Sequence, residues 1–155
     1  MKLKEWQKVI LSILTIVVGG FILFNIAFII AAGIHQVGNL LARLISGRDD
    51  FAVNPMFWRF LFVVVILFIS WFIFKSKWNT LVKATYLTMP LMVLLIVEGI
   101  LLYRQPSWIP IDVGAIIIAS VLFYLYQKKL PWQYYFATFF TGAVALIVVL
   151  AGIEI

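Results

Sequence analysis

Residues 9–34 read VILSILTIVVGGFILFNIAFIIAAGI, a stretch without a charged side chain. Because a transmembrane helix needs about 20 consecutive apolar residues, this stretch is long enough to cross the hydrocarbon core of a membrane. It follows a basic N-terminus, as the apolar region of a signal peptide does, but that region is only about 7–15 residues long. We therefore expect an uncleaved first transmembrane helix over residues 9–34.

Four further apolar stretches cover residues 57–74, 80–103, 111–126 and 132–153. In lipid every backbone N–H and C=O needs an internal partner, so stretches of this length are expected to be helices. The sequence thus predicts an all-α, polytopic membrane protein with five transmembrane helices, forming one integral membrane domain over residues 1–155. Because the stretch 111–126 is the shortest, four spans with a re-entrant segment are the alternative.

The composition agrees with a membrane domain, since 65% of the residues are hydrophobic and 12% are charged. Ordinary soluble domains are about 45–50% apolar and about 25% charged. The absence of cysteine excludes disulfides, thiol catalysis and cysteine-ligated metal centres. The net charge of +6 is spread over short loops, so topology explains it better than a polyanion does. We expect the lipid bilayer as a partner and no nucleic acid.

The two basic residue types lie beside opposite ends of the apolar stretches. The lysines are Lys2, Lys4, Lys8, Lys75, Lys77, Lys83, Lys128 and Lys129, and the arginines are Arg43, Arg48, Arg59 and Arg104. The lysine side carries an excess of positive charge, whereas acidic residues offset the arginines on the other side. Positive charge is retained in the cytoplasm, so we expect a cytoplasmic N-terminus, an external C-terminus and a plasma membrane of bacterial type.

The loop after the first span contains a second helical pattern over residues 36–47. Its apolar positions are spaced by three and four residues, as on one face of a helix, and are Val37, Leu40, Leu41, Leu44 and Ile45. We expect a short outer amphipathic helix that ends at Ser46 and Gly47. It could lie in the headgroup plane, cap the bundle or hold a partner.

Small residues at helical spacing indicate where membrane helices pack closely. Thr138, Thr141 and Gly142 form such a stripe in the last span, and Ala115 and Ala119 form one in the fourth. The first span has small residues as well, whereas the second is rich in Phe and Val. We therefore expect the first, fourth and fifth spans at the centre and the second facing lipid. The same stripes would suit a homo-oligomer.

Glu98 is the residue that best indicates a function, because it lies inside the apolar stretch 80–103. An ionisable group within a membrane is costly and is a candidate functional residue. It could carry a proton, or it could pair with Arg104 or Arg59 near the interface. Pro90 removes an N–H from mid-helix and frees the carbonyl of Tyr86. Tyr86, Pro90 and Glu98 are spaced by multiples of four, so we expect them on one broad face, lining a substrate or proton path.

Asn25 lies deep in the first span, where its amide needs a hydrogen-bond partner. We favour a role in holding two helices together over ligand contact, and Glu98 is a conceivable partner.

An outer polar cluster of His35, Asp112 and Arg104 is a further candidate. Asp112 follows Pro110 and would also cap the start of the fourth span. A single histidine cannot form a bis-histidine haem site or a histidine-rich metal site, so we expect no metal and no cofactor. The sequence also contains none of the HExxH, GxSxG, Walker A or GxGxxG motifs.

Three classes of function remain. We favour an accessory subunit or component of a larger membrane complex, because the chain has no catalytic motif and has several small-residue faces. The alternative is a small oligomeric transporter or channel in which Glu98, Asn25, Tyr86 and Pro90 line the path. A membrane-embedded enzyme acting on lipids, with His35, Glu98 and Asp112 near the outer face, is the second alternative. Catalysis is not favoured, since a nucleophile or metal cluster is missing.

Overall fold

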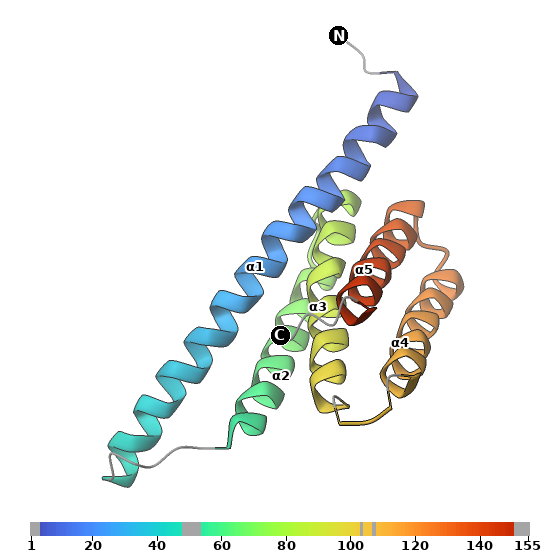
Figure 1. The fold of residues 1–155 in the computed structure, drawn as a ribbon. Coiled ribbons are helices and arrows are strands. Elements are labelled where there is room, and N and C mark those ends of the chain that lie inside the picture. The colour runs from blue at the N-terminus through green and yellow to red at the C-terminus, as the bar shows by residue number, and fades with distance from the viewer. Residues whose placement is uncertain (1–3, 48–53, 103, 107, 151–155) are drawn as a thin grey trace.

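The computed structural model describes residues 4–47, 54–102, 104–106 and 108–150, with side chains up to Val148. Every regular element in this part of the chain is an α-helix (Figure 1). The helices are α1 (Glu5–Ser46), α2 (Pro55–Lys75), α3 (Thr80–Leu101), α4 (Trp108–Gln127) and α5 (Trp132–Leu150). The expected span ends at 103 and 153, and the residues 48–53 that include Arg48, lie outside the described residues.

The structure is that of a helical membrane protein. Within the described residues, α1, α2, α3 and α4 are each long and apolar enough to cross a membrane. The fifth expected span, α5, is apolar over Trp132–Val148 and is shorter. The all-α fold class predicted from the sequence is confirmed.

The first helix is longer than predicted, because α1 runs through 42 residues without interruption. The segment 36–47 is helical and ends at Ser46 and Gly47 as expected, but it continues α1 and is not a separate helix. No proline interrupts the chain between the two segments. The helix stops where Gly47 adopts a left-handed backbone conformation with φ 65° and donates its N–H to the carbonyl of Arg43 at 3.0 Å.

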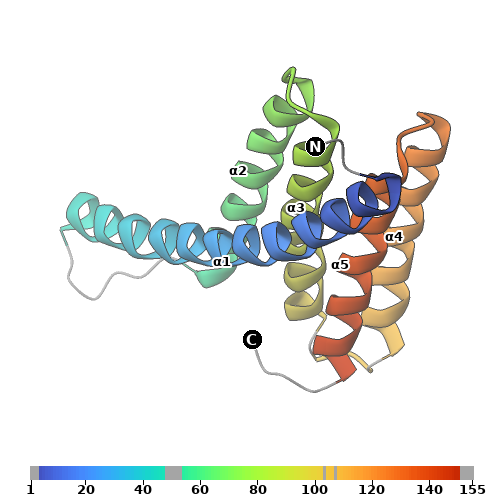
Figure 2. The same ribbon diagram turned by 90° about the horizontal axis from the view of Figure 1, so that it is seen from above.

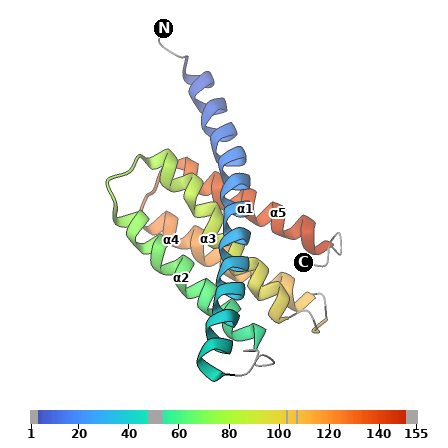
Figure 3. The same cartoon turned by 90° about the vertical axis from the view of Figure 1, so that its left-hand side faces the viewer.

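At 1.5 Å per residue, α1 is about 63 Å long, which exceeds the bilayer thickness of about 40–45 Å. It runs obliquely along one face of the other helices and extends beyond them (Figures 1, 2 and 3). A helix of this length therefore crosses the membrane at a tilt, projects from it, or does both.

The expected packing order is corrected, because α3 lies at the centre and contacts each of the other four helices. Most of its residues between Ala84 and Leu95 are buried, whereas α4 is buried only at Leu125. The stripe of the last span is confirmed, since Thr138 and Thr141 of α5 are fully buried. In α4, however, Ala115 and Ala119 are exposed. In lipid both the outward and the inward faces of a helix are apolar, so the hydrophobic pattern does not distinguish them.

Two glycines allow α1 to cross α3 closely. A Cβ atom added at Gly19 would lie 2.6 Å from the methyl group of Thr85, and one added at Gly20 would lie 2.9 Å from the hydroxyl oxygen of Thr88. Because neither glycine has a side chain, the two backbones approach each other at this point. Thr85 and Thr88 direct their own hydroxyl groups to carbonyls of α3, those of Leu81 and Thr85 respectively.

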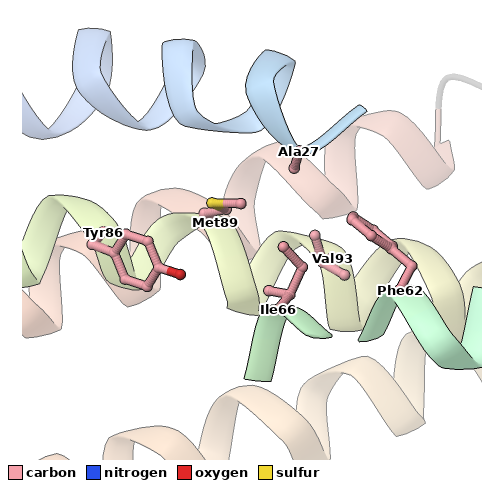
Figure 4. Close-up of a cluster of buried hydrophobic side chains, with 6 residues drawn as sticks. All are labelled: Ala27, Phe62, Ile66, Tyr86, Met89 and Val93. Atoms are coloured by element: carbon pink, nitrogen blue, oxygen red, sulfur yellow. The ribbon is translucent and has the colours of Figure 1, made fainter. Parts of the chain in front are cut away.

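The core of the bundle consists of two clusters of buried side chains. One joins α1, α2 and α3 and is shown in Figure 4; its members are Ala27, Phe62, Ile66, Tyr86, Met89 and Val93. The other joins α3, α4 and α5 through Ala84, Leu125 and Tyr134. Together they enclose the half of α3 that begins at Thr80, whereas the half that ends at Leu101 is less covered.

Candidate functional site

Glu98 lies in the last turn of α3 and faces α4. A Cβ atom added at Gly114 of α4 would lie 3.8 Å from Glu98 Oε2 and 3.5 Å from the side chain of Leu95. The lack of a side chain at Gly114 thus leaves room for the carboxylate between the two helices. Glu98 Oε1 is buried and accepts no hydrogen bond. The carboxyl group is therefore held at a helix contact with a buried oxygen that has no hydrogen-bond partner.

The alternative in which Glu98 pairs with Arg104 or Arg59 is not seen. Within the described residues the ion pair that forms joins Lys8 Nζ to Glu5 Oε1 at 2.7 Å, at the other end of the bundle. Arg104 is exposed in the turn between α3 and α4, and Arg59 lies on α2 beside a groove that α1 and α3 also line. Glu98 is directed away from that groove, toward α4.

Asn25 is not a partner of Glu98 either. It lies halfway along α1, on the exposed face, and its Nδ2 donates to the carbonyl of Phe21 at 2.8 Å. Its oxygen receives no hydrogen bond from the described part of the chain. The amide thus faces outward at the middle of an apolar helix, and the expected bond to another helix of this bundle is absent.

Tyr86 and Pro90 are both buried in α3, but Tyr86 does not share a face with Glu98. The hydroxyl oxygen of Tyr86 lies 3.3 Å from Ser70 Oγ on α2, and Ser70 donates to the carbonyl of Ile66 at 2.6 Å. Tyr86 and Glu98 are twelve residues apart, which is about three and a third turns of a helix, so they point in directions a third of a turn apart. The common face that we expected for Tyr86 and Glu98 is therefore not present.

The outer polar cluster is also not assembled. His35 is exposed on α1, where its ring nitrogens lie 3.4 and 3.5 Å from Asn39 Nδ2. Asp112 is exposed on α4, which begins at Trp108; the helix tolerates Pro110 in its first turn because the N–H there has no acceptor within the helix. Asp112 therefore does not cap α4. Among the described residues, no group of three or more His, Asp or Glu side chains could hold a metal ion.

One polar contact was not predicted from the sequence. Trp58 Nε1 on α2 donates to Asn39 Oδ1 on α1 at 3.0 Å. The ring of Trp58 packs on Gly38, where a Cβ atom would collide with it. The signal for this contact was a glycine inside a helical pattern, opposite a tryptophan early in the next span. The contact joins the start of α2 to the half of α1 that ends at Ser46.

Three polar side chains in the described residues therefore have an atom without a partner, and they lie apart from one another. They are the carboxylate of Glu98 between α3 and α4, the buried Oε1 of Gln133 at the start of α5, and the outward-facing amide of Asn25 on α1. A carboxylate at a helix contact can bind a proton or a cation, and an amide can donate and accept a hydrogen bond. Neither provides a nucleophile beside a general base, which covalent catalysis requires. Comparison of the chain with protein-family models, with curated proteins and with solved structures gives no match.

Proposed function

We propose that this protein is an accessory component of a larger membrane complex and that it docks there through α1. The observation that carries the proposal is the exposed amide of Asn25. Its oxygen receives no hydrogen bond within the described residues. A bare amide in hydrocarbon is costly, and acyl chains offer no donor, so a second protein helix is the partner that lowers this cost.

The surroundings of Asn25 suit a helix partner. Phe21, Ile22 and Ile29 flank the amide and are 68%, 53% and 71% exposed. Gly33, about two turns further along, has no atom within 4 Å of the position of its missing Cβ. This face therefore offers apolar side chains for van der Waals contact and a small residue where a backbone can approach.

The experiment is photo-cross-linking in the source membrane, with a benzophenone amino acid introduced at Ile29. We expect a discrete adduct with a different protein, identified by mass spectrometry. Val64 on α2 is 61% exposed and provides the matched control, where we expect only lipid adducts. Asn25→Leu should weaken the adduct, whereas Ile22→Leu should preserve it. If Ile29 gives the same adducts as Val64, the proposal is overturned. Cross-links to a second copy of this protein would also overturn it and would indicate a homo-oligomer.

We further propose that the N-terminus is cytoplasmic in a plasma membrane of bacterial type. In the described chain the start of α1 and the connections α2–α3 and α4–α5 lie at one end of the bundle (Figure 1). The described lysines lie in these connections or in the adjoining helix turns, and Arg43, Arg59 and Arg104 lie toward the other end, which supports this orientation. Because the chain has no cysteine, Lys129→Cys and Arg104→Cys can each be labelled alone. An impermeant maleimide should label only Arg104→Cys in intact cells; the reverse result would invert the topology.

A second candidate function is proton-coupled or cation-coupled transport through Glu98. The observation in its favour is the buried, unpartnered Oε1 at the α3–α4 contact. The test is flux driven by a pH gradient in proteoliposomes. Glu98→Gln should abolish the flux without changing the folded fraction, while Asp112→Asn, an exposed carboxylate on α4, should retain it. Equal flux in all three proteins would remove Glu98 from this role.

A further inference from the structure

A groove runs between α1, α2 and α3 in the half of the bundle where α2 begins. It has a volume of about 160 Å³. On α1 its lining residues are spaced by three and four from Phe24 to Ala31, and on α3 they are spaced in the same way from Val93 to Ile100. Such spacing places each set along one face of its helix. The groove therefore follows the helices for about two turns and has the direction of a lipid chain in a bilayer.

The floor of the groove is closed and its side is open. Ala27, Phe62 and Val93 are 2%, 8% and 4% exposed, and Figure 4 shows these three side chains from α1, α2 and α3 near one another. Phe28, at the edge, is 42% exposed. A long apolar molecule could thus enter from the lipid phase and lie on a preformed apolar surface.

The groove is lined almost entirely by apolar atoms, and one charged residue stands at one end of it. Since α2 runs antiparallel to α1 and α3, Phe24, Phe62 and Val93 lie at the deep end, and Ala31, Arg59 and Ile100 lie toward the membrane surface. Arg59 is the lining residue that carries a charge. This distribution matches the polarity of a phospholipid, with a charged headgroup above an apolar chain.

We expect the guanidinium of Arg59 near the level of the headgroups. It is four residues from the start of α2, a rise of about 6 Å, and follows Trp58, whose indole is typical of the interface. No described carboxylate forms an ion pair with Arg59. A phosphate can satisfy a guanidinium with two parallel hydrogen bonds, and a lipid with net negative charge neutralises it.

We propose that this groove binds an anionic glycerophospholipid, with one acyl chain between α1 and α3 and the phosphate on Arg59. The occupant is a lipid from the surrounding leaflet and not a free phosphate, because nearly all of the lining is apolar and only its surface end is charged. Basic pockets between transmembrane helices recognise lipid headgroups by the same electrostatics. Binding here requires neither a partner at Asn25 nor a proton at Glu98.

The experiment is native mass spectrometry of the detergent-purified protein titrated with phosphatidylglycerol or phosphatidylcholine of equal chain length. We expect one preferred site for phosphatidylglycerol. Arg59→Gln should weaken it by about tenfold to a hundredfold, the equivalent of losing a hydrogen bond to a charged group, and should remove the preference over phosphatidylcholine. Arg43→Gln, an exposed arginine of α1 outside the groove, is the matched control and should bind like the wild type.

A second variant tests the contribution of the acyl chain to binding separately from that of the headgroup. Ala31→Phe fills the surface end of the groove and should weaken both lipids, whereas glycerol phosphate, which has no acyl chain, should not compete. If Ala31→Phe misfolds, judged by gel filtration and circular dichroism, the Arg59→Gln comparison still decides. Equal binding of the two lipids to the wild type, unchanged binding in Arg59→Gln, or competition by glycerol phosphate would each overturn the proposal.

Discussion

The two halves of α3 differ in whether their buried polar groups have hydrogen-bond partners. In the half that begins at Thr80, Thr85 and Thr88 are buried against α1 and bond to carbonyls of their own helix, and Tyr86 lies beside Ser70 of α2. In the half that ends at Leu101, Glu98 has a buried oxygen without a partner. Satisfied buried polar groups fix the packing of a bundle, whereas an unsatisfied one needs a separate explanation; the buried Oε1 of Gln133 on α5 is a second such group.

We expect the greatest loss of stability from a substitution where α1 crosses α3. Gly20→Val would bring its side chain against the hydroxyl and methyl groups of Thr88, with the Cβ 2.9 Å from Thr88 Oγ1. Overpacking of this kind costs about 1–3 kcal/mol, and we expect the upper end because α1 and α3 would separate. The measurement is the free energy of unfolding by SDS titration in mixed micelles.

Gly33→Val is the matched control, since it makes the same substitution in the same helix where no atom lies within 4 Å of the added Cβ. It carries the same change in helix propensity. If the two variants unfold with equal free energies, the crossing at Gly20 does not hold the bundle together.

In the other half of α3 we expect a substitution to raise the free energy of unfolding. Glu98→Met replaces a carboxylate that has an unpartnered oxygen with an apolar side chain of similar length. Leaving a buried polar group unsatisfied costs about 1–3 kcal/mol, so this variant should unfold with a higher free energy than the wild type. Stabilities are measured by the same titration. A destabilised Glu98→Met would mean that the carboxylate already has a partner, and the contrast between the halves would disappear.

We expect a smaller increase in stability from a substitution that gives the Glu98 carboxylate a hydrogen-bond donor. The Cβ position at Gly114 lies 3.8 Å from Glu98 Oε2 and makes only ordinary contact with Leu95, so a side chain fits there. Gly114→Ser should donate a hydrogen bond to the carboxylate and stabilise the protein by about 1 kcal/mol relative to Gly114→Ala. Equal unfolding free energies of these two variants would show that the serine hydroxyl does not reach Glu98.

The helices themselves were predictable from the sequence, because lipid forces long apolar stretches to be helical. The end of α1 was predictable too, since Gly47 supplies a left-handed backbone conformation after an apolar stripe. The continuation of α1 through His35 was missed: we expected a loop after residue 34, but a few polar residues do not stop a helix. Apolar length thus predicted which segments are helical better than it predicted where one helix ends and the next begins.

The packing order could not be derived from small-residue stripes. Ala115 and Ala119 have the same spacing as Ala137 and Thr141, but the first pair is exposed and the second pair is buried. The pattern identifies a surface that permits close approach without specifying which helix uses it.

Glu98 could be singled out as a charge in an apolar stretch, but its neighbour could not be predicted. Arg59 and Arg104 were plausible partners because they lie toward the same end of the bundle as Glu98. The direction of a side chain around α3 depends on helix rotation, which loop positions do not determine. The rotation places Glu98 against Gly114 and leaves Arg59 on another side of the helix.

We expect the least loss of stability from removing the hydroxyl group of Tyr86. Tyr86→Phe removes the hydroxyl that lies 3.3 Å from Ser70 Oγ and leaves the ring in its buried position between α2 and α3. Hydrogen bonds between membrane helices contribute about 0.6 kcal/mol on average, because the separated helices also find polar partners. Ser70 retains its bond to the carbonyl of Ile66, so no orphaned group adds to this loss. A decrease of more than about 2 kcal/mol in the SDS titration would exceed the range of such bonds and would mean that Tyr86 positions α2 by more than this contact.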